Sequence, residues 1–186
     1  MKDQRFTPQR SLLVIIDMQQ RLMPAIEHGA RLVDQVCRLM QAAQLLDIPI
    51  VLVEENPAGL GATERRIRQM APRAPVIAKM AFGAGDEAVV LAEFEKRRAA
   101  GRDQFILAGT EAHVCVLQSA LGLAARGYHV GVVSDCIGSR RAHDRDVAIT
   151  RMSGAGVSPL TGEMIVFEWL ASAAHPQFKK ILDTVR

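Results

Sequence analysis

Short, mostly apolar runs alternate with longer amphipathic stretches along this chain. Runs of only a few residues that stay apolar throughout are typical of strands covered on both faces. The pattern predicts strands at 12–16, 48–53, 75–78, 104–108 and 128–133, with a further short strand near Val157.

Between these runs, apolar residues recur every three or four positions, as on the buried face of an amphipathic helix. Leu32, Val36 and Leu39 illustrate this spacing. The segment from Glu54 to Gly61 is expected to be a loop, because it is rich in proline and glycine. The pattern predicts helices at 30–46, 86–100, 113–126 and 142–153, and two C-terminal helical stretches divided by Pro176.

Strands that alternate with helices form right-handed βαβ units and a parallel sheet. Because both faces of the predicted strands are apolar, helices must cover both sides. The expected fold is therefore a three-layer α/β/α sandwich, and the length suits a single domain spanning 1–186. In such sheets ligands bind beyond the carboxyl ends of the strands. Four polar residues stand there: Asp17, Glu54, Lys79 and Asp135.

Composition narrows the function classes. The chain has 23 Lys and Arg against 20 Asp and Glu, too balanced to favour nucleic-acid binding. Basic clusters at 65–73 and 96–102 are interpreted as solvated helix faces, since glutamates lie nearby. No apolar run approaches the roughly 20 residues of a membrane span. The segment from Met1 to Arg10 has no signal-peptide pattern, so we expect a cytoplasmic protein that does not bind membranes.

The three cysteines suggest chemistry at one position. An odd, sparse set is not a disulfide framework and fits a reducing compartment. Cys37 in mid-helix and Cys136 after a strand are interpreted as small core residues. Cys115 is predicted in the first turn of a helix at the carboxyl edge of the sheet. There the helix dipole would lower the pKa of the thiol, and free N–H groups could hold an oxyanion.

Three segments carry a resemblance to a known family. Leu12 to Gln19, Lys79 to Phe82 and Gly109 to Val116 resemble, in this order, the three motifs of the isochorismatase-like cysteine hydrolases. The loop from Asn56 to Gly61 resembles the compact subgroup of isochorismatase-domain proteins. The resemblance extends over essentially the whole chain and implies a sandwich with a six-stranded parallel sheet.

The resemblance also implies a site. It assigns a catalytic triad to Asp17, Lys79 and Cys115, and a non-proline cis peptide bond to Thr110–Glu111. The implied reaction is hydrolysis of a small-molecule amide through a thioester, without a cofactor, in a homo-oligomer. The N–H of Cys115 and a neighbour in the loop up to Val114 would hold the oxyanion. Candidates for lining the substrate pocket are Gln19, Phe82 and His113.

Departures from the family pattern and two alternatives remain open. Residues 54–61 contain no histidine, unlike the metal-binding cluster of nicotinamidases, so no metal is expected. Isochorismatases that cleave a vinyl ether need no cysteine, so Cys115 favours acyl chemistry. The segment from Gly83 to Ala88 matches a dinucleotide-binding fingerprint, but Asp86 and Glu87 would repel pyrophosphate. The second alternative is a non-catalytic binding or scaffold protein that keeps the fold.

Overall fold

A computed structural model describes residues 4–185 of the protein. Met1 to Asp3 and Arg186, which belong to the domain predicted over 1–186, lie outside the described residues. The strands are β1 (Ser11–Ile16), β2 (Ile50–Glu55), β3 (Val76–Lys79), β4 (Gln104–Thr110), β5 (His129–Gly138) and β6 (Ser158–Leu160). The helices are α1 (Gly29–Leu45), α2 (Pro57–Leu60), α3 (Arg65–Met70), α4 (Ala88–Ala99), α5 (Leu117–Ala125), α6 (Ala142–Gly154), α7 (Gly162–Leu170) and α8 (Phe178–Val185).

The strands form one sheet in the order β3-β2-β1-β4-β5-β6, and every neighbouring pair is parallel. The chain builds β1, β2 and β3 outward in one direction and then returns to place β4 on the other side of β1. The order therefore reverses between β1 and β4, and a crevice at this kind of reversal is where open parallel sheets bind ligands.

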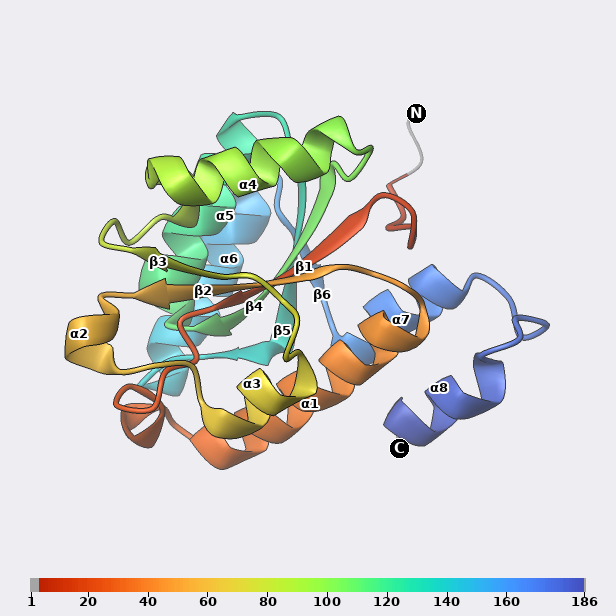
Figure 1. The fold of residues 1–186 in the computed structure, drawn as a ribbon, viewed down its shortest axis with the longest axis horizontal. Helices are drawn as coiled ribbons and strands as arrows, with labels where there is room; N and C mark the ends of the chain where they lie inside the picture. The colour runs from red at the N-terminus through yellow and green to blue at the C-terminus, as the bar shows by residue number, and fades with distance from the viewer. Residues whose placement is uncertain (1–3, 186) are drawn as a thin grey trace.

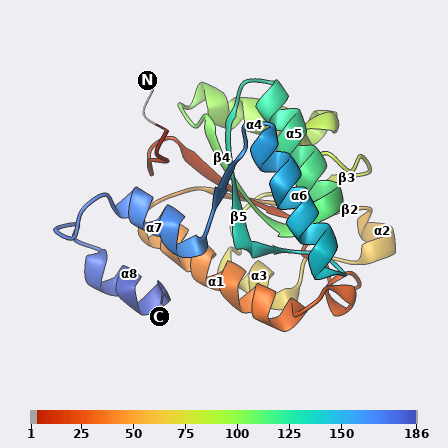
Figure 2. The same ribbon diagram turned by 180° about the vertical axis from the view of Figure 1, so that it is seen from behind.

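Helices cover both faces of the sheet, as predicted. Helices α1, α3, α7 and α8 lie on one side, and α4, α5 and α6 on the other (Figures 1 and 2). Alternate residues of β1 face opposite layers: Leu13 and Ile15 pack with the first set of helices, and Leu12, Val14 and Ile16 with the second. All five side chains are fully buried, which explains why this strand is apolar without alternation.

Two predicted boundaries were wrong. The segment from Glu54 to Gly61 is not all loop, because Glu54 and Glu55 end β2 and Pro57–Leu60 forms the short helix α2. Strand β5 continues to Gly138 instead of ending at Val133.

Asp135 and Cys136 therefore lie inside a strand and not in a loop. The strand tolerates its polar residues because their side chains have partners. Ser134 Oγ donates to Leu160 O at 2.9 Å, and Asp135 Oδ1 accepts from Gly162 N at 2.8 Å.

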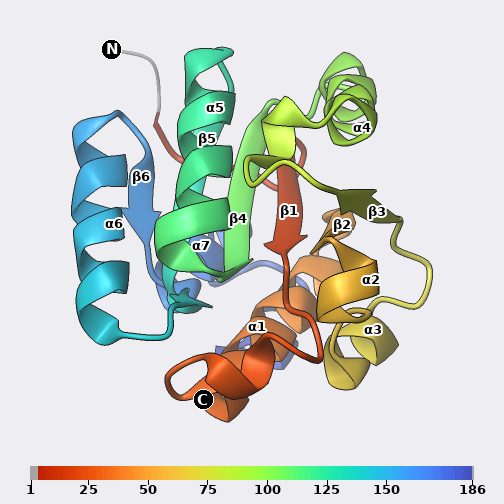
Figure 3. The same ribbon diagram turned by 90° about the vertical axis from the view of Figure 1, so that its left-hand side faces the viewer.

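Among residues 4–185, no helix has the length and apolar character needed to cross a bilayer. Seen from the carboxyl edge of the sheet, β1 lies between β2 and β4, and β4 leads into the segment that precedes α5 (Figure 3). This edge carries the candidate site.

Candidate active site

Asp17 follows the last residue of β1 in a left-handed backbone conformation, with φ of 49°. Aspartate is among the few non-glycine residues that adopt this region readily. Its N–H donates to Val53 O at 3.0 Å, and its C=O accepts from Thr110 Oγ1 at 2.6 Å. Bonds to the strands on both sides thus fix the backbone that carries the carboxylate.

Gly109 allows β4 to approach this turn. Its φ is 120°, and a Cβ at this position would lie 2.0 Å from the carbonyl oxygen of Ile16. Only glycine fits against the end of β1 here. The motif that begins at Gly109 is therefore a requirement of close packing beside Asp17.

Lys79 ends β3 and points into the interior, where its side chain is fully buried. Its Nζ donates to Asp17 Oδ2 at 2.9 Å and to Glu55 Oε2 at 2.6 Å. A buried ammonium is tolerated only when it is paired and hydrogen-bonded, and these two carboxylates satisfy that requirement.

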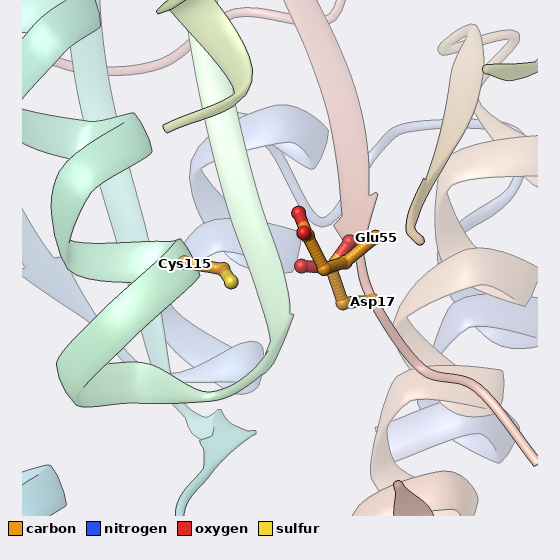
Figure 4. A group of neighbouring side chains, drawn as sticks. All are labelled: Asp17, Glu55 and Cys115. Carbon is orange, nitrogen blue, oxygen red and sulfur yellow. The ribbon is translucent and has the colours of Figure 1, made fainter. Parts of the chain in front are cut away.

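Cys115 lies in a single π-helical turn, Ala112–Val116, that leads into α5. Its sulfur and one carboxylate oxygen each of Asp17 and Glu55 all lie within 4.8 Å of one another. Figure 4 shows the thiol pointing from the start of this helix toward the two carboxylates. The peptide bond Thr110–Glu111 is cis, at the position that the resemblance implied. The predicted triad residues thus converge.

The turn is closed by hydrogen bonds to one carbonyl. The N–H groups of Val114 and Val116 both donate to Glu111 O at 3.1 Å. The N–H of Val114, expected among the oxyanion donors, is therefore engaged within the turn in this conformation. Outside the turn, Arg140 Nε donates to the Glu111 carboxylate at 2.8 Å.

Burial decides the protonation of the acid and the thiol. It raises the pKa of Asp17 to about 6, although the charge and hydrogen bond of Lys79 oppose the change. Burial also raises the pKa of the Cys115 thiol above its ordinary value, and the negative charge of Asp17 adds to the effect. For Lys79, burial works against the charged form, but its carboxylate partners outweigh it and raise the pKa.

The lowered thiol pKa expected at the helix start is therefore wrong for the resting protein. Desolvation of the thiolate and the negative charge of Asp17 both raise the thiol pKa. At neutral pH the site holds a protonated thiol beside an ionised Asp17. Asp17 Oδ1 is buried and has no hydrogen-bond partner among the described residues.

Glu55 is the site residue that the sequence reasoning missed. The prediction selected Glu54 as the acid after the second strand, but Glu54 Oε1 accepts from the N–H and hydroxyl of Thr63, at 2.7 and 2.6 Å. Side chains alternate along a strand, so Glu55 faces the opposite way, toward Lys79. The signal that could have found Glu55 was the pairing of the end of β2 with the end of β3, where Glu55 lies beside Lys79.

Gln19 has no exposed surface in this structure. It is fully buried, and its side chain bonds the backbone of Glu55 at both ends, with Oε1 accepting from Glu55 N and Nε2 donating to Glu55 O, both at 2.9 Å. Nε2 also donates to Gly61 O at 2.7 Å. Gln19 therefore fixes the end of β2, which corrects the expectation that it contacts substrate.

The other two pocket candidates lie beside the triad segments. Phe82 is 53% exposed in the loop after Lys79, so its ring is available at the surface. His113 is half-buried, and its Nδ1 lies 3.0 Å from Ser139 Oγ, which connects the cysteine turn to the residue after β5. His113 has a structural contact in addition to its position near the thiol.

Comparison with known proteins identifies the family of the chain. The isochorismatase domain family matches residues 11–164. Isochorismatase domain-containing protein 1 of Danio rerio is 34% identical over 182 residues, which cover 97% of this chain and 62% of that protein. Isochorismatase domain-containing protein 2A of Mus musculus is 33% identical over 185 residues, which cover 98% of this chain and 85% of that protein.

The chain belongs to the isochorismatase domain family. It spans less than two thirds of the length of the fish relative. The MAR1 ribonuclease from Caenorhabditis elegans has a similar structure, with a TM-score of 0.89 and 31% identity over 97% of this chain and 92% of that one. The YcaC gene product of Escherichia coli is described as an octameric hydrolase of unknown specificity. Its structure has a TM-score of 0.84 and 24% sequence identity, and the match covers 97% of this chain and 96% of that chain. At that identity the likeness shows the fold alone.

In this isochorismatase domain, Asp17, Glu55 and Cys115 each bring one oxygen or sulfur atom into a cluster of the size that could hold a metal ion. Lys79, however, already bonds both carboxylates. Its ammonium occupies the position where a cation would bind, so we assign no metal ligand there.

The structure also bears on the dinucleotide-binding alternative for the segment from Gly83 to Ala88. The carboxylate of Glu87 accepts from the N–H groups of Met80 and Ala81, at 3.0 and 3.3 Å. The carboxylate of Asp86 pairs with Arg126 at 3.2 Å. The N–H groups of Met80 and Ala81 already hold a protein carboxylate, which disfavours pyrophosphate binding.

Proposed function

We propose that this isochorismatase domain is a cysteine-dependent hydrolase that cleaves a small-molecule amide through a thioester. The observation that carries the proposal is the buried contact of Lys79 with Asp17 beside the Cys115 thiol, with one oxygen of Asp17 left unbonded. A nucleophile, a base within reach and a group that orients the base are the parts that covalent catalysis requires.

The first half-reaction forms the acyl-enzyme. Cys115 Sγ attacks the carbonyl carbon while its proton passes to Asp17 Oδ1. Because the resting thiol is protonated, the proton transfer to Asp17 accompanies the attack, and the mechanism does not require a thiolate in the resting enzyme. Backbone N–H groups of Cys115 and a neighbour in the 110–114 loop would donate to the oxyanion. The C–N bond then breaks, and the amine leaves with the proton from Asp17.

The second half-reaction restores the enzyme. Water attacks the thioester carbonyl and gives a proton to Asp17. The C–S bond breaks, the carboxylic acid leaves, and Cys115 recovers its proton from Asp17. Lys79 stays charged throughout and holds Asp17 in place. The sum is amide plus water to acid plus amine, with no cofactor.

A panel of small aliphatic and aromatic amides tests this proposal. Wild-type protein should release amine, and intact-mass analysis after rapid quenching should show the acyl group on Cys115. Cys115→Ser should lose most of the turnover, because a hydroxyl is a far weaker nucleophile under the same base. Equal turnover by wild type and the serine variant would exclude the thioester route, and binding without turnover would favour the scaffold alternative.

The name of the nematode relative raises ribonuclease activity as a second candidate. Within the two basic clusters, Arg66 pairs with Asp34 at 2.7 Å, and Arg97 pairs with Glu93. Each such pair reduces the positive charge available to a phosphate backbone. Incubation with single-stranded RNA should give no cleavage that depends on Cys115, and cleavage lost in Cys115→Ser would replace the amide by RNA as substrate.

We also propose a homo-oligomer in a reducing compartment, the cytoplasm. The relative from Escherichia coli is described as octameric. Cys37, Cys115 and Cys136 are all free thiols, as expected where disulfides do not persist. Light scattering coupled to gel filtration tests the assembly; a monomer at all concentrations would exclude it.

A further inference from the structure

Lys79 pairs with two carboxylates where catalysis as proposed needs only one. Its Nζ is closer to Glu55 Oε2, at 2.6 Å, than to Asp17 Oδ2, at 2.9 Å. The side chains of Lys79 and Asp17 are fully buried, and that of Glu55 is 10% exposed. Removing a second carboxylate from water is costly, so its presence calls for a physical account.

The fold builds Glu55 into this position. In the parallel pairing of β2 with β3, Glu55 is the register partner of Lys79, so their side chains leave the sheet on the same face. Gln19, in the segment that follows β1, then fixes the backbone of Glu55 with two hydrogen bonds. A carboxylate placed by both the register and these hydrogen bonds has little freedom to leave Lys79.

The charged groups around Asp17 come from each neighbouring element. Lys79 lies at the end of β3, Glu55 at the end of β2 and the Cys115 thiol before α5. Glu87 at the start of α4 interacts with Lys79 but is bonded to the loop N–H groups. Glu54 faces away, toward Thr63. With the thiol protonated, two carboxylates and one ammonium leave the cluster with one net negative charge.

We propose that Glu55 is a positioning residue that shares the charge of Lys79 and thereby keeps Asp17 basic enough to take the proton of the buried thiol. A lysine paired with Asp17 alone would neutralise that carboxylate more fully and weaken it as a base. The second carboxylate opposes this neutralisation. The same charge disfavours the resting thiolate, so Glu55 keeps Cys115 protonated until a substrate arrives. The catalytic use of this device rests on the proposed function.

Alkylation of Cys115 by iodoacetamide, followed by peptide mass mapping, tests the inference without any amide substrate. Glu55→Gln keeps an acceptor for Lys79 but removes the charge. Because the thiolate is then less disfavoured, Cys115 should alkylate about three- to tenfold faster at a fixed, mildly alkaline pH, as a fall of up to one unit in the thiol pKa implies. The acid limb of the rate profile for an amide should move to lower pH.

Two variants act as controls. Glu54→Gln makes the same change on the neighbouring residue that faces Thr63 and should leave the alkylation rate within about twofold of wild type. Glu55→Asp keeps the charge, and its alkylation rate should also stay within about twofold of wild type. It remains the variant to measure if Glu55→Gln does not fold. An unchanged rate in Glu55→Gln, or the same acceleration in Glu55→Asp, would overturn the role of the charge. Failure of amide turnover with the alkylation shift present would instead contradict the proposed function alone.

Discussion

Two acid–cysteine pairs stand near the carboxyl edge of the same sheet and differ in almost every physical respect. In the first, Asp17 and Cys115 come from separate elements and meet beside Lys79. In the second, Asp135 and Cys136 are neighbours within β5. Both thiols are buried, and burial raises the pKa of each.

The carboxylates account for the difference. Asp135 uses an oxygen to accept from the first N–H of α7, so its bond is structural. Asp17 is held by Lys79 through one oxygen and keeps the other unbonded. Under the proposed mechanism, a cysteine beside an acid is therefore not enough to make a reactive pair. The mechanism also requires that a cation fixes the acid and that one carboxylate oxygen remains available for the proton.

The largest expected difference is in turnover. Cys115→Ala should lower kcat/KM for an amide substrate by at least about a thousandfold, because a nucleophile and its base act as a unit. Cys136→Ala should change kcat/KM less than about threefold and cost on the order of 1 kcal/mol in stability through a small cavity. Steady-state kinetics and urea unfolding on both variants measure this. Comparable losses of turnover would remove the distinction between the two pairs.

The cation should dominate the stability of the first pair. Lys79→Met leaves the carboxylates of Asp17 and Glu55 buried without their partner, which should cost about 3–5 kcal/mol of unfolding free energy at neutral pH. The matched control is Lys96→Met, whose ammonium is exposed and 3.9 Å from Glu93, with an expected change below about 0.5 kcal/mol. Urea unfolding compares them. If both variants lose equally little, Lys79 is not the counter-ion that holds the cluster.

The pH profile should report the base. With the pKa of Asp17 raised to about 6, kcat/KM should fall about tenfold per pH unit below that value, because protonated Asp17 cannot accept the thiol proton. Asp17→Asn should remove the activity at every pH. A limb near 4, the ordinary value for aspartate, would contradict the raised pKa.

The same shift sets the sign of a stability effect. Folded Asp17 holds its proton more tightly than Asp17 in the unfolded chain. Its contribution to stability therefore becomes more favourable as pH falls from about 6 toward 4, and is least favourable above 6. Asp17→Asn should consequently unfold at the same or a higher urea concentration than wild type at neutral pH. A clear loss of stability would show that the ion pair outweighs the burial of this carboxylate.

The fold was predictable where burial acts on whole segments. The runs at 12–16 and 104–108 are apolar because helices cover both faces of β1 and β4, and the alternation with helices implies a parallel sheet. Strand β5 was predicted too short because Ser134 and Asp135 look like a loop. Their partners, Leu160 and Gly162, belong to the next strand and helix and cannot be read from local pattern.

The site was predictable only in part for the same reason. Asp17, Lys79 and Cys115 lie at or beyond the carboxyl ends of strands and stand in motifs, so position and resemblance both indicated them. Glu55 looks identical to Glu54 in sequence, and only the register of β2 against β3 separates the two. The thiol pKa was predicted in the wrong direction because a helix start is visible in sequence, whereas the desolvation that raises the pKa depends on packing.

The smallest expected effect concerns the acid of the second pair. Asp135→Asn keeps an oxygen that can accept from Gly162 N, so stability should change by less than about 0.5 kcal/mol and kcat/KM by less than about twofold. Asp135→Ala removes the acceptor and should cost about 1 kcal/mol, as the loss of a helix-start bond does, again without loss of turnover. A large fall in kcat/KM in Asp135→Asn would mean that β5 supplies a second functional acid. The contrast with Asp17, where the amide substitution is expected to abolish activity, would then no longer separate a structural carboxylate from a base.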